Sequence, residues 1–283
     1  MANGNVVITG ASTGIGRECA LRLAAHGWHV FAGVRKNEDM ESLAKEAPQL
    51  LTPILIEVTD EGSIRAAARR VGEALGDGGL NGLVNNAGIS VAGPLEALPI
   101  EALSRQLSVN VVGQIAVTQA FLPLIRKGRG RILFMGSILG RFAVPFLGAY
   151  SAAKFALEAA SDALAMELRG SGVRVSIIEP GSIATPIWTK TRDSVLRMRE
   201  ESPEKAWDHY AEILERFGSS AQRLASSGIQ PARVAATVER VLTSRRPRAR
   251  YPVGADSQLF GRIAPLLPGR MRQAIVRRAV VPR

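Results

Sequence analysis

The stretch "NVVITGASTGIG" at residues 5–16 decides the fold class of this chain. It runs from a short apolar, β-branched segment through a turn with glycines at 10, 14 and 16, and then enters the helical pattern "GRECALRLAAHG" (16–27). Glycine lets a backbone turn sharply and approach a ligand, and the first turn of a helix offers unpaired N–H groups to a phosphate. With a second strand about 20 residues further on, this order predicts a dinucleotide-binding unit.

The same alternation of apolar runs and helical patterns continues along the chain. It predicts βαβ units and a parallel sheet covered by helices on both sides. Pro53 suggests that the third strand begins after it. We expect strands within 5–9, 28–34, 50–58, 80–85, 131–136 and 173–180, and helices over 16–27, 39–47, 62–75, 100–125 and 149–169.

No linker interrupts this pattern before residue 186, so one domain over 1–283 is expected. After that point the pattern changes. We expect a core of about 5–190 plus 231–254, a helical insertion over a pocket at 186–230, an amphipathic helix at 231–243, a late strand within 248–254, and a basic tail at 255–283 with a Pro-interrupted helix over 260–280.

Composition and targeting signals are those of an ordinary globular protein. The chain has 283 residues, 46% of them hydrophobic, and its one cysteine, Cys19, cannot form an intrachain disulfide. No basic leader precedes an apolar run at the N-terminus, and no stretch reaches 18 apolar residues, so we expect a cytoplasmic protein. His26, His29 and His209 have no metal-ligand spacing with one another or with Cys19, so no metal site is expected.

The net charge of +11 is concentrated at the C-terminal end. Between Arg245 and Arg283 there are ten arginines and one acid, Asp256, while the rest of the chain is nearly balanced. Such a block attracts nucleic acid, anionic lipid or an acidic carrier protein, but it is more often a solvated face or a subunit contact. No nucleic-acid module accompanies it, so we expect no nucleic-acid partner, and we do not favour contact with a membrane surface.

The end of the second strand predicts which dinucleotide binds. An acid at this place accepts hydrogen bonds from a ribose 2′-hydroxyl, whereas an arginine pairs with a 2′-phosphate. This chain has "FAGVRK", with Val34 where an acid often stands, followed by Arg35. We therefore expect NADP(H), with Arg35 as the clamp and Ser12 as a second donor. NAD(H) is the alternative, with Arg35 a solvent-facing loop residue.

The stretch "GAYSAAKFAL" (148–157) places a phenol, Tyr150, and an ammonium, Lys154, four residues apart on a predicted helix. Both side chains then lie on one face and can approach a common point. On an arbitrary helix such a pair is most often two surface neighbours, so its meaning depends on the motifs around it.

Those motifs stand in a fixed order along residues 5–190, and on them the chain resembles the short-chain dehydrogenases/reductases. The resemblance implies a Rossmann-type doubly wound parallel sheet, a nicotinamide cofactor, and a homo-oligomer that pairs through the helices around 100–125 and 150–169. It also implies a catalytic group of Asn110, Ser137, Tyr150 and Lys154. The motifs are "TGASTGIG" (9–16), "NNAG" (85–88), Asn110 in "LSVNVVG", Ser137 in "MGSILG", "YSAAK" (150–154) and "PGSIATP" (180–186).

The roles implied for these residues concern proton transfer. An unperturbed tyrosine has a pKa near 10, so acid–base work near pH 7 requires lowering by about three units. The Lys154 ammonium and an oxidised nicotinamide ring are expected to supply that lowering by electrostatic attraction. Ser137 is expected to hold the substrate oxygen, with a turn former as the alternative. Asn110 is expected to kink its helix and hold a water that relays the proton through Lys154, with a buried structural asparagine as the alternative.

The resemblance also implies the cofactor contacts. Asn85 and the backbone of Ala87 and Gly88 are expected on the ribose side, and the segment after the sixth strand at the nicotinamide end. Glu57 stands where an aspartate usually meets the adenine amine, which makes that contact less secure. The expected cofactor-binding residues are Gly10, Ser12, Thr13, Gly14, Ile15, Gly16, Arg35, Glu57, Val58, Asn85, Ala87, Gly88, Tyr150, Lys154, Pro180, Gly181, Ile183 and Thr185.

Apolar residues around the catalytic group suggest the substrate. The segment "ILGRFAVPFLGA" (138–149) and the start of the insertion are apolar, which predicts a large pocket for a lipophilic alcohol or ketone. In texture the chain resembles steroid and retinol dehydrogenases and their bacterial relatives. Two alternatives are a ketoacyl thioester reductase whose acidic carrier docks on the basic tail, and a non-catalytic NADP(H)-sensing protein. The expected substrate contacts are Ser137, Leu139, Phe146, Tyr150, Ile187 and Trp188.

Overall fold

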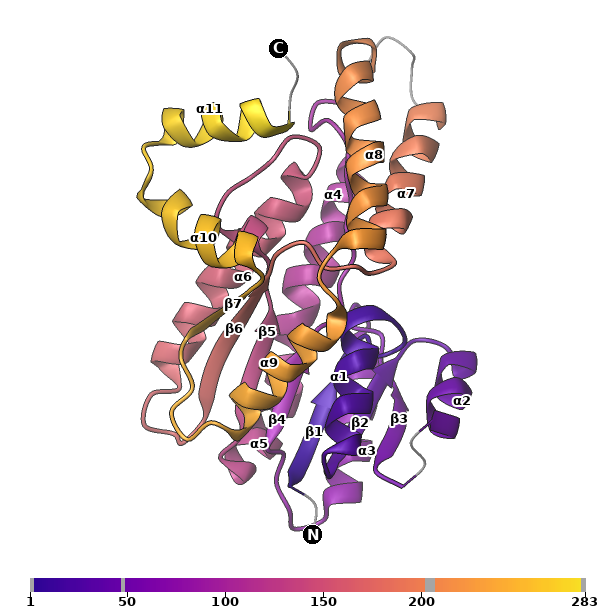
Figure 1. Ribbon diagram of the computed structural model, residues 1–283. Coiled ribbons are helices and arrows are strands. Elements are labelled where there is room, and N and C mark those ends of the chain that lie inside the picture. Colours follow the sequence, from indigo (N-terminus) through magenta and orange to yellow (C-terminus); the bar gives the residue numbers. More distant parts are fainter. Residues whose placement is uncertain (1–2, 47–48, 202–206, 281–283) are drawn as a thin grey trace.

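The computed structural model describes residues 3–46, 49–201 and 207–280, and within them seven parallel strands form one sheet (Figure 1). The strand order is β3-β2-β1-β4-β5-β6-β7, so the winding reverses between β1 and β4, where open α/β sheets bind ligands. The predicted α/β class with a doubly wound parallel sheet is confirmed. The strands are β1 Gly4–Ile8, β2 Trp28–Val34, β3 Leu51–Leu55, β4 Gly82–Asn85, β5 Arg131–Met135, β6 Arg174–Pro180 and β7 Arg250–Val253.

Helices cover both faces of the sheet because each strand sends alternate side chains to opposite sides. In β1, Val6 and Ile8 pack into the core on one face, and Val7 packs into the core on the other. The first face is covered by α1 (Gly14–Ala25), α2 (Asn37–Glu46) and α9 (Pro231–Thr243), and the second by α3 (Glu61–Leu75), α5 (Gly113–Gly128) and α6 (Gly148–Glu167).

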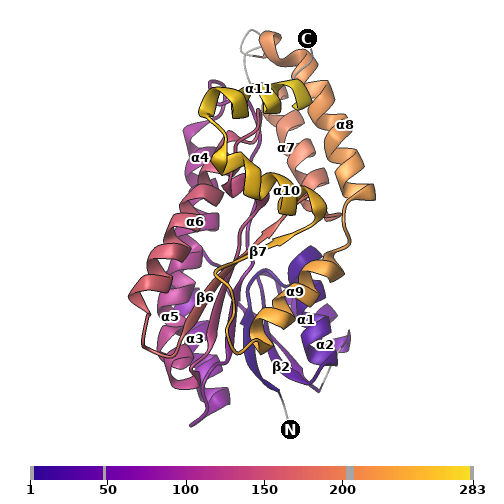
Figure 2. The same cartoon turned by 60° about the vertical axis from the view of Figure 1, so that its left-hand side comes forward.

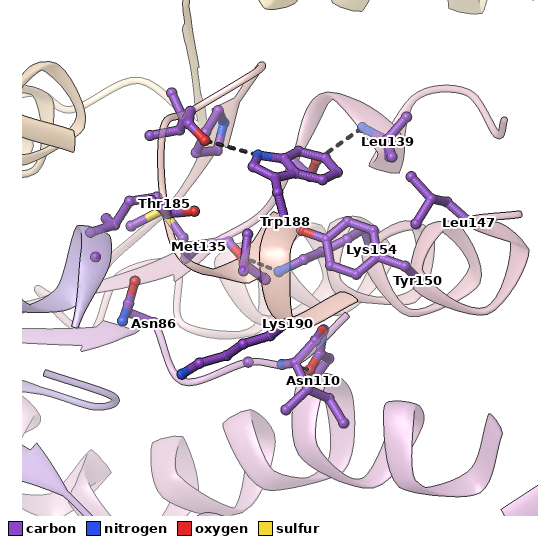
Figure 3. A pocket seen from close by; sticks show the side chains of 18 of the residues that line it. Asn86, Asn110, Met135, Leu139, Leu147, Tyr150, Lys154, Thr185, Trp188 and Lys190 are labelled. Atoms are coloured by element: carbon purple, nitrogen blue, oxygen red, sulfur yellow. Dashed lines mark hydrogen bonds between the residues drawn. The ribbon is translucent and has the colours of Figure 1, made fainter. Parts of the chain in front are cut away.

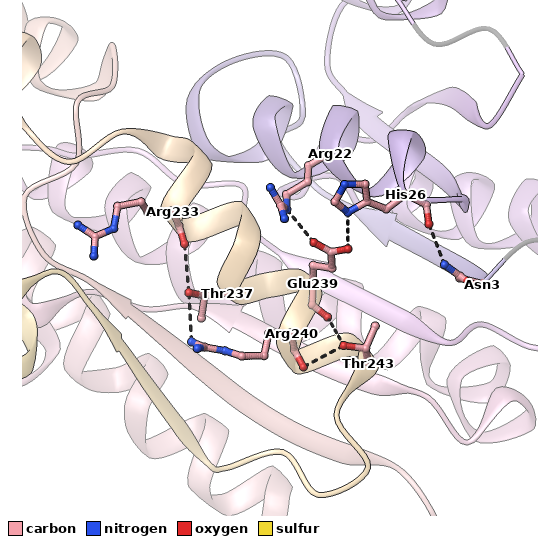
Figure 4. A network of polar contacts seen from close by, with 8 residues as sticks. All are labelled: Asn3, Arg22, His26, Arg233, Thr237, Glu239, Arg240 and Thr243. Carbon is pink, nitrogen blue, oxygen red and sulfur yellow. Dashed lines mark hydrogen bonds and ion pairs between the residues drawn. The ribbon is translucent and has the colours of Figure 1, made fainter.

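Helix α9, predicted at the same residues, joins the late part of the chain to the first βαβ unit. Its Glu239 accepts a hydrogen bond from Arg22 Nε at 2.7 Å and lies 2.5 Å from the Nδ1 atom of His26, both on α1 or at its end (Figure 4). His26 is thus a structural residue, as expected from its lack of metal-ligand spacing.

The expectation that β3 begins after Pro53 is wrong. The strand starts at Leu51, and Pro53 lies opposite Ala32 of β2 within the ladder. Proline has no N–H to donate, but β3 is an edge strand with β2 as its one neighbour, and the N–H of Ile56 points to the Val34 carbonyl. Because donors alternate sides, the Pro53 nitrogen faces the free edge, where no hydrogen bond is lost.

The helix expected over 100–125 runs without a break from Ile100 to Gly128, with one π-helical turn in its middle. Helix α4 (Ile100–Leu107) passes through a π-helical turn at Ser108–Val112 into α5. Within the described residues, Ile100–Gly128 is the one segment long and apolar enough to cross a membrane. Its Val117, Phe121 and Ile125 are fully buried in the core beside the sheet, so it is a core helix of this domain.

The insertion and the tail both rise above the carboxyl ends of the strands (Figures 1 and 2). Helices α7 (Ile187–Glu201) and α8 (Ala211–Ser227) pack on each other, and α10 (Ala255–Ile263) and α11 (Gly269–Val280) follow β7. Short 3₁₀ turns occur at Ile138–Gly140, Asp208–Tyr210 and Ala264–Leu266. Four pieces of the expected ranges lie outside the described residues: 1–2 and 47–48 of the domain, 202–206 of the insertion, and 281–283 of the tail.

Candidate active site

A cavity of about 700 Å³ opens at the carboxyl ends of the strands, between the glycine-rich turn, α7, α8 and α10. It brings together residues from the whole length of the chain (Figure 3). The predicted site residues that line it are Gly10, Ser12, Thr13, Gly14, Ile15, Arg35, Glu57, Val58, Ala87, Gly88, Asn110, Ser137, Leu139, Tyr150, Lys154, Pro180, Gly181, Ile183, Thr185, Ile187 and Trp188.

The glycine-rich turn forms a cradle, which side chains at the glycine positions would fill. Gly10 and Gly14 have φ values of +66° and +58°, a region that favours glycine. A Cβ atom on Gly10 would lie 2.8 Å from the Cα of Ala87. Helix α1 starts at Gly14, and its N-cap, Thr13, makes no capping hydrogen bond through its side chain. The first turn of α1 therefore has free N–H groups for a phosphate, and the turn fits the pyrophosphate of a dinucleotide.

Two residues expected to contact the cofactor lie behind the cavity wall. Gly16 is buried, and a Cβ atom there would lie 2.3 Å from the Gly10 carbonyl oxygen, so this glycine allows α1 to pack against the turn. Asn85 is fully buried, and its Nδ2 donates to Thr118 Oγ1 at 2.8 Å. Its neighbour Asn86 lines the cavity instead, and Asn86 Nδ2 donates to the carbonyls of Thr9 and Gly10 at 3.0 and 3.1 Å.

Phe146, expected at the substrate, is also displaced from the cavity. It has a φ value of +68°, and its ring packs into the apolar cluster under α7 and α8, the two lid helices, which we call the lid core. There it stacks on Phe217 with 5.7 Å between ring centroids and meets Trp207 and Tyr210 edge-on. Leu147 lines the cavity in its place.

Arg35 follows β2 directly and lies at the cavity's edge with 62% of its side chain exposed. Its NH1 atom is 3.9 Å from Glu57 Oε2, and Glu57 Oε1 accepts hydrogen bonds from the N–H and hydroxyl of Thr59. Glu57 therefore faces the guanidinium, and Arg35 remains open to a second, stronger anion.

Tyr150 and Lys154 both face the cavity from α6. The Lys154 ammonium lies 5.5 Å from the centre of the Tyr150 ring and donates to the Met135 carbonyl at 2.6 Å (Figure 3). Burial raises the pKa of Tyr150 to about 12, although a hydrogen bond with Ser137 opposes this. Burial lowers the pKa of Lys154 to about 8. The lowering of the Tyr150 pKa was expected from Lys154 together with an oxidised nicotinamide ring, and that joint effect stays a prediction.

A buried charged cluster lies one helical turn beyond Lys154. Glu158 Oε2 is 3.0 Å from Arg250 Nε, and Glu179 Oε1 is 2.8 Å from Arg141 Nε. Glu179 Oε1 also lies 3.9 Å from Arg250 Nε, so the two buried carboxylates share this guanidinium. Burial, followed by the charge of Glu179, raises the pKa of Glu158 to about 8, and Glu158 in turn opposes the lowering of the Lys154 pKa.

Asn110 sits in the π-helical turn, where the expected distortion of the helix is found. Its side chain is fully buried, with Oδ1 accepting from the Ile89 N–H and Nδ2 donating to the Ile89 carbonyl, both at 2.9 Å. The amide thus holds the loop after β4 in place. Its role in a proton relay stays a prediction.

The far end of the cavity is apolar. Trp188 lines it, with its indole N–H donating to the Ile183 carbonyl at 2.9 Å. Several lining residues were not named from the sequence, although three of them lie in the apolar segment 138–149 and two in the amphipathic insertion and tail. These are Phe142, Val144, Leu147, Phe217 and Phe260, together with the cations Lys190, Arg216 and Arg223.

The arrangement suits a dinucleotide and a proton donor, and it does not suit a metal. Within the described residues no group of three or more histidine, cysteine or acidic side chains could hold a metal ion. The cradle, the exposed guanidinium of Arg35 and the half-buried phenol of Tyr150 share one space, so a bound nicotinamide cofactor and a reacting oxygen could meet there.

Comparisons with known proteins agree with this site. The family model described as short chain dehydrogenase matches residues 4–195. A 3-amino-tetrahydro-pyrrolizinone reductase of Xenorhabdus hominickii is 38% identical over 94% of this chain and 92% of its own. Retinol dehydrogenase 5 of Mus musculus is 37% identical over 96% and 87%. A short chain dehydrogenase structure from Burkholderia cenocepacia in complex with NADP has a TM-score of 0.73 and 25% identity, with 99% of both chains covered. The chain belongs to the short-chain dehydrogenase/reductase family and is an oxidoreductase.

Proposed function

We propose that this protein transfers a hydride between NADP(H) and a lipophilic alcohol or ketone, with Tyr150 as the general acid or base. The observation that carries the proposal is the continuity of one cavity. It connects the glycine cradle and Arg35 at one end with an apolar wall at the other, and the Tyr150 phenol lies between them.

The chain's own residues supply the proton that the carbonyl oxygen receives during reduction. Bound NADP(H) supplies or accepts the hydride. With its pKa raised to about 12, Tyr150 is protonated at neutral pH and can donate to a carbonyl oxygen during reduction. Ser137 lines the cavity together with Tyr150, and its hydroxyl can hold the same oxygen. The Lys154 ammonium, 5.5 Å from the phenol ring, stabilises the phenolate left behind.

The preference for NADP(H) over NAD(H) rests on Arg35. A guanidinium directly after β2 matches a 2′-phosphate, and no acid occupies position 34 to bind a 2′-hydroxyl. The Burkholderia cenocepacia structure that contains NADP supports the same choice. NAD(H) is the alternative if Arg35 stays with Glu57.

The lipophilic substrate class rests on the apolar wall and on the relative named as a retinol dehydrogenase. A second candidate is reduction of a ketoacyl thioester carried by an acidic protein. The cations Lys190 and Arg216 at the cavity favour it, because they would suit an anionic linker.

We also infer a homo-oligomer in the cytoplasm. Ile100, Val112, Phe155 and Met166 are exposed apolar side chains on the α4–α6 face, where the family pairing was expected. The buried free thiol of Cys19 suits a reducing compartment.

A turnover screen tests the proposal. The purified protein is assayed with NADPH and NADH against a retinoid aldehyde, a steroid ketone, a fatty aldehyde, and a ketoacyl thioester both free and carrier-bound. We expect NADPH to be consumed with a free lipophilic carbonyl. Turnover limited to carrier-bound thioester would favour the second candidate, and turnover limited to small polar carbonyls would overturn the proposal.

A further inference from the structure

The C-terminal helices expose a concentration of apolar side chains. Within the described residues, thirteen large hydrophobic side chains are exposed, and six of them lie between residues 259 and 275. Their exposed fractions run from 43% to 83%. Four exposed arginines stand among them and form no ion pair with any described acid. We call this set the α10–α11 surface: Leu259, Phe260, Ile263, Leu266, Met271 and Ile275, with Arg262, Arg270, Arg277 and Arg278.

The spacing of these residues gives each helix an apolar edge. Leu259 and Ile263 are one turn apart on α10, and Leu266 continues the same edge through the following 3₁₀ turn. On α11, Met271 and Ile275 are likewise one turn apart. Exposed leucine and isoleucine lie beside arginines, whose long aliphatic stems can place the guanidinium at the lipid headgroups. This pattern is typical of a helix that lies in a bilayer interface.

The α10–α11 surface adjoins the mouth of the cavity. Phe260 belongs to both, because it lines the cavity and is also exposed. Its ring lies 6.4 Å from that of Phe142, another lining residue. Figures 1 and 2 show α10 and α11 at the same end of the molecule as the lid helices α7 and α8.

We propose that the α10–α11 surface docks this protein on an anionic lipid bilayer, with the cavity mouth turned toward the lipid. Charge complementarity selects this occupant, since the described residues 255–280 hold five arginines and one acid, Asp256. Asp256 is itself occupied, because it accepts from the Ser182 N–H at 2.8 Å.

A second copy of the chain fits this surface poorly. A two-fold contact would place the same arginines opposite one another, with no acid in the patch to pair with them. Nucleic acid would satisfy the arginines but leave six large apolar side chains in water. The sequence alone did not favour a membrane, because charge by itself does not distinguish these partners. The exposed apolar edge does.

Vesicle sedimentation tests the docking without cofactor or substrate. The full chain is mixed with phosphatidylcholine vesicles that either lack or contain about 30% phosphatidylglycerol. We expect binding at least tenfold stronger to the anionic vesicles, and its loss in about 0.5 M salt. Equal binding to both, or none, overturns the proposal, and neither result touches the proposed hydride transfer.

Matched variants locate the surface. Replacing Arg270, Arg277 and Arg278 by Gln should abolish the preference for anionic vesicles, whereas replacing the exposed Arg65, Arg69 and Arg70 of α3 by Gln should not. Leu259→Ser with Leu266→Ser should weaken binding at least tenfold, and Leu55→Ser, at the end of the edge strand β3 and away from the inferred subunit face, should leave it unchanged. Equal losses in test and control variants would overturn the proposal, as would binding of an acidic carrier protein in place of vesicles. Circular dichroism and turnover of a soluble substrate check that each variant folds.

The position of the cavity mouth has its own test, and this part rests on the proposed function. A lipophilic substrate is supplied either in detergent or within anionic vesicles. We expect the Leu259→Ser, Leu266→Ser variant to lose activity only with the vesicle-borne substrate. Loss with both forms of substrate would show that the surface acts on the active site and not on delivery.

Discussion

The two ends of the cavity are built by different means. The cofactor end is made of backbone: glycines at positive φ, the start of α1, and residues directly after strands. The apolar end is made of side chains from four separate segments, represented by Phe142, Trp188, Phe217 and Phe260. Backbone geometry accepts one kind of ligand, whereas apolar side chains set only size and polarity. The fold therefore defines the cofactor class far more narrowly than the substrate.

Tyr150 and Lys154 lie between the two ends, where burial opposes both of their charged forms. It raises the pKa of Tyr150 to about 12 and lowers that of Lys154 to about 8. The protein thus keeps the phenol protonated and the amine close to losing its proton. Variants at the middle, at the cofactor end and at the substrate end should differ in which kinetic constant they change.

The largest effect is expected for Tyr150→Phe in the middle of the cavity. The change removes the proton donor but keeps the ring beside Lys154. We expect kcat to fall about a thousandfold while cofactor affinity changes less than threefold. Steady-state kinetics and a fluorescence titration with NADPH measure the two quantities. Retention of more than a tenth of the activity would contradict the acid–base role.

Arg35→Asp tests the cofactor end. Loss of the guanidinium and gain of a carboxylate should weaken NADPH binding by about 10- to 100-fold, with NADH affected less than threefold. Lys36→Asp is the matched control, because Lys36 makes the same charge change next door but does not line the cavity. Equal weakening for both cofactors would refute pairing with a 2′-phosphate.

Trp188→Ala tests the apolar end. The indole covers the cavity, so its removal should raise KM for a lipophilic substrate about tenfold and leave kcat within a few fold. The KM for NADPH should stay unchanged. Trp188→Phe, which keeps an aromatic ring, should raise KM for the same substrate much less. A similar fall in kcat and kcat/KM would place Trp188 with the catalytic group.

The same contrast explains what the sequence could predict. Glycines before a helix and a Tyr–Lys pair at helical spacing report local geometry, and Gly10, Gly14, Tyr150 and Lys154, which these patterns single out, all line the cavity. Asn85 and Asn86 show the limit of such reasoning. A shift of one residue at a strand's end turns a side chain to the opposite side, and Asn85 faces Thr118 of α5.

Which residues reach the cavity at its apolar end depends on tertiary packing, and a local sequence pattern does not predict that packing. Phe146 was predicted at the substrate, but its ring packs into the lid core beside Phe217. Phe217 and Phe260 reach the cavity from helices far along the chain. Amphipathic spacing predicts that such residues are buried or half-buried. Which surface they pack against depends on tertiary contacts.

The smallest effect is expected for Glu158→Gln. Glu158 does not line the cavity, and its replacement acts on Lys154 in the middle of the cavity through its charge. Glu158 and Lys154 lie one turn apart on α6, and with its pKa raised to about 8, Glu158 is a carboxylate above that pH. There it keeps the Lys154 ammonium charged, which glutamine cannot do. The Lys154 pKa should therefore fall in the variant, and the basic limb of kcat/KM should move to lower pH by about half a unit.

A pH profile from about pH 6 to about pH 10 measures this shift, and it separates electrostatics from packing. Asp162→Asn is the control: Asp162 lies one turn further along α6 and also pairs with Arg250, at 2.5 Å. It removes a charge from the same cluster without removing the one that acts on Lys154. If both variants move the basic limb equally, the effect passes through Arg250. If neither moves it, a group other than Lys154 sets that limb, and the tie between the buried cluster and proton transfer is lost.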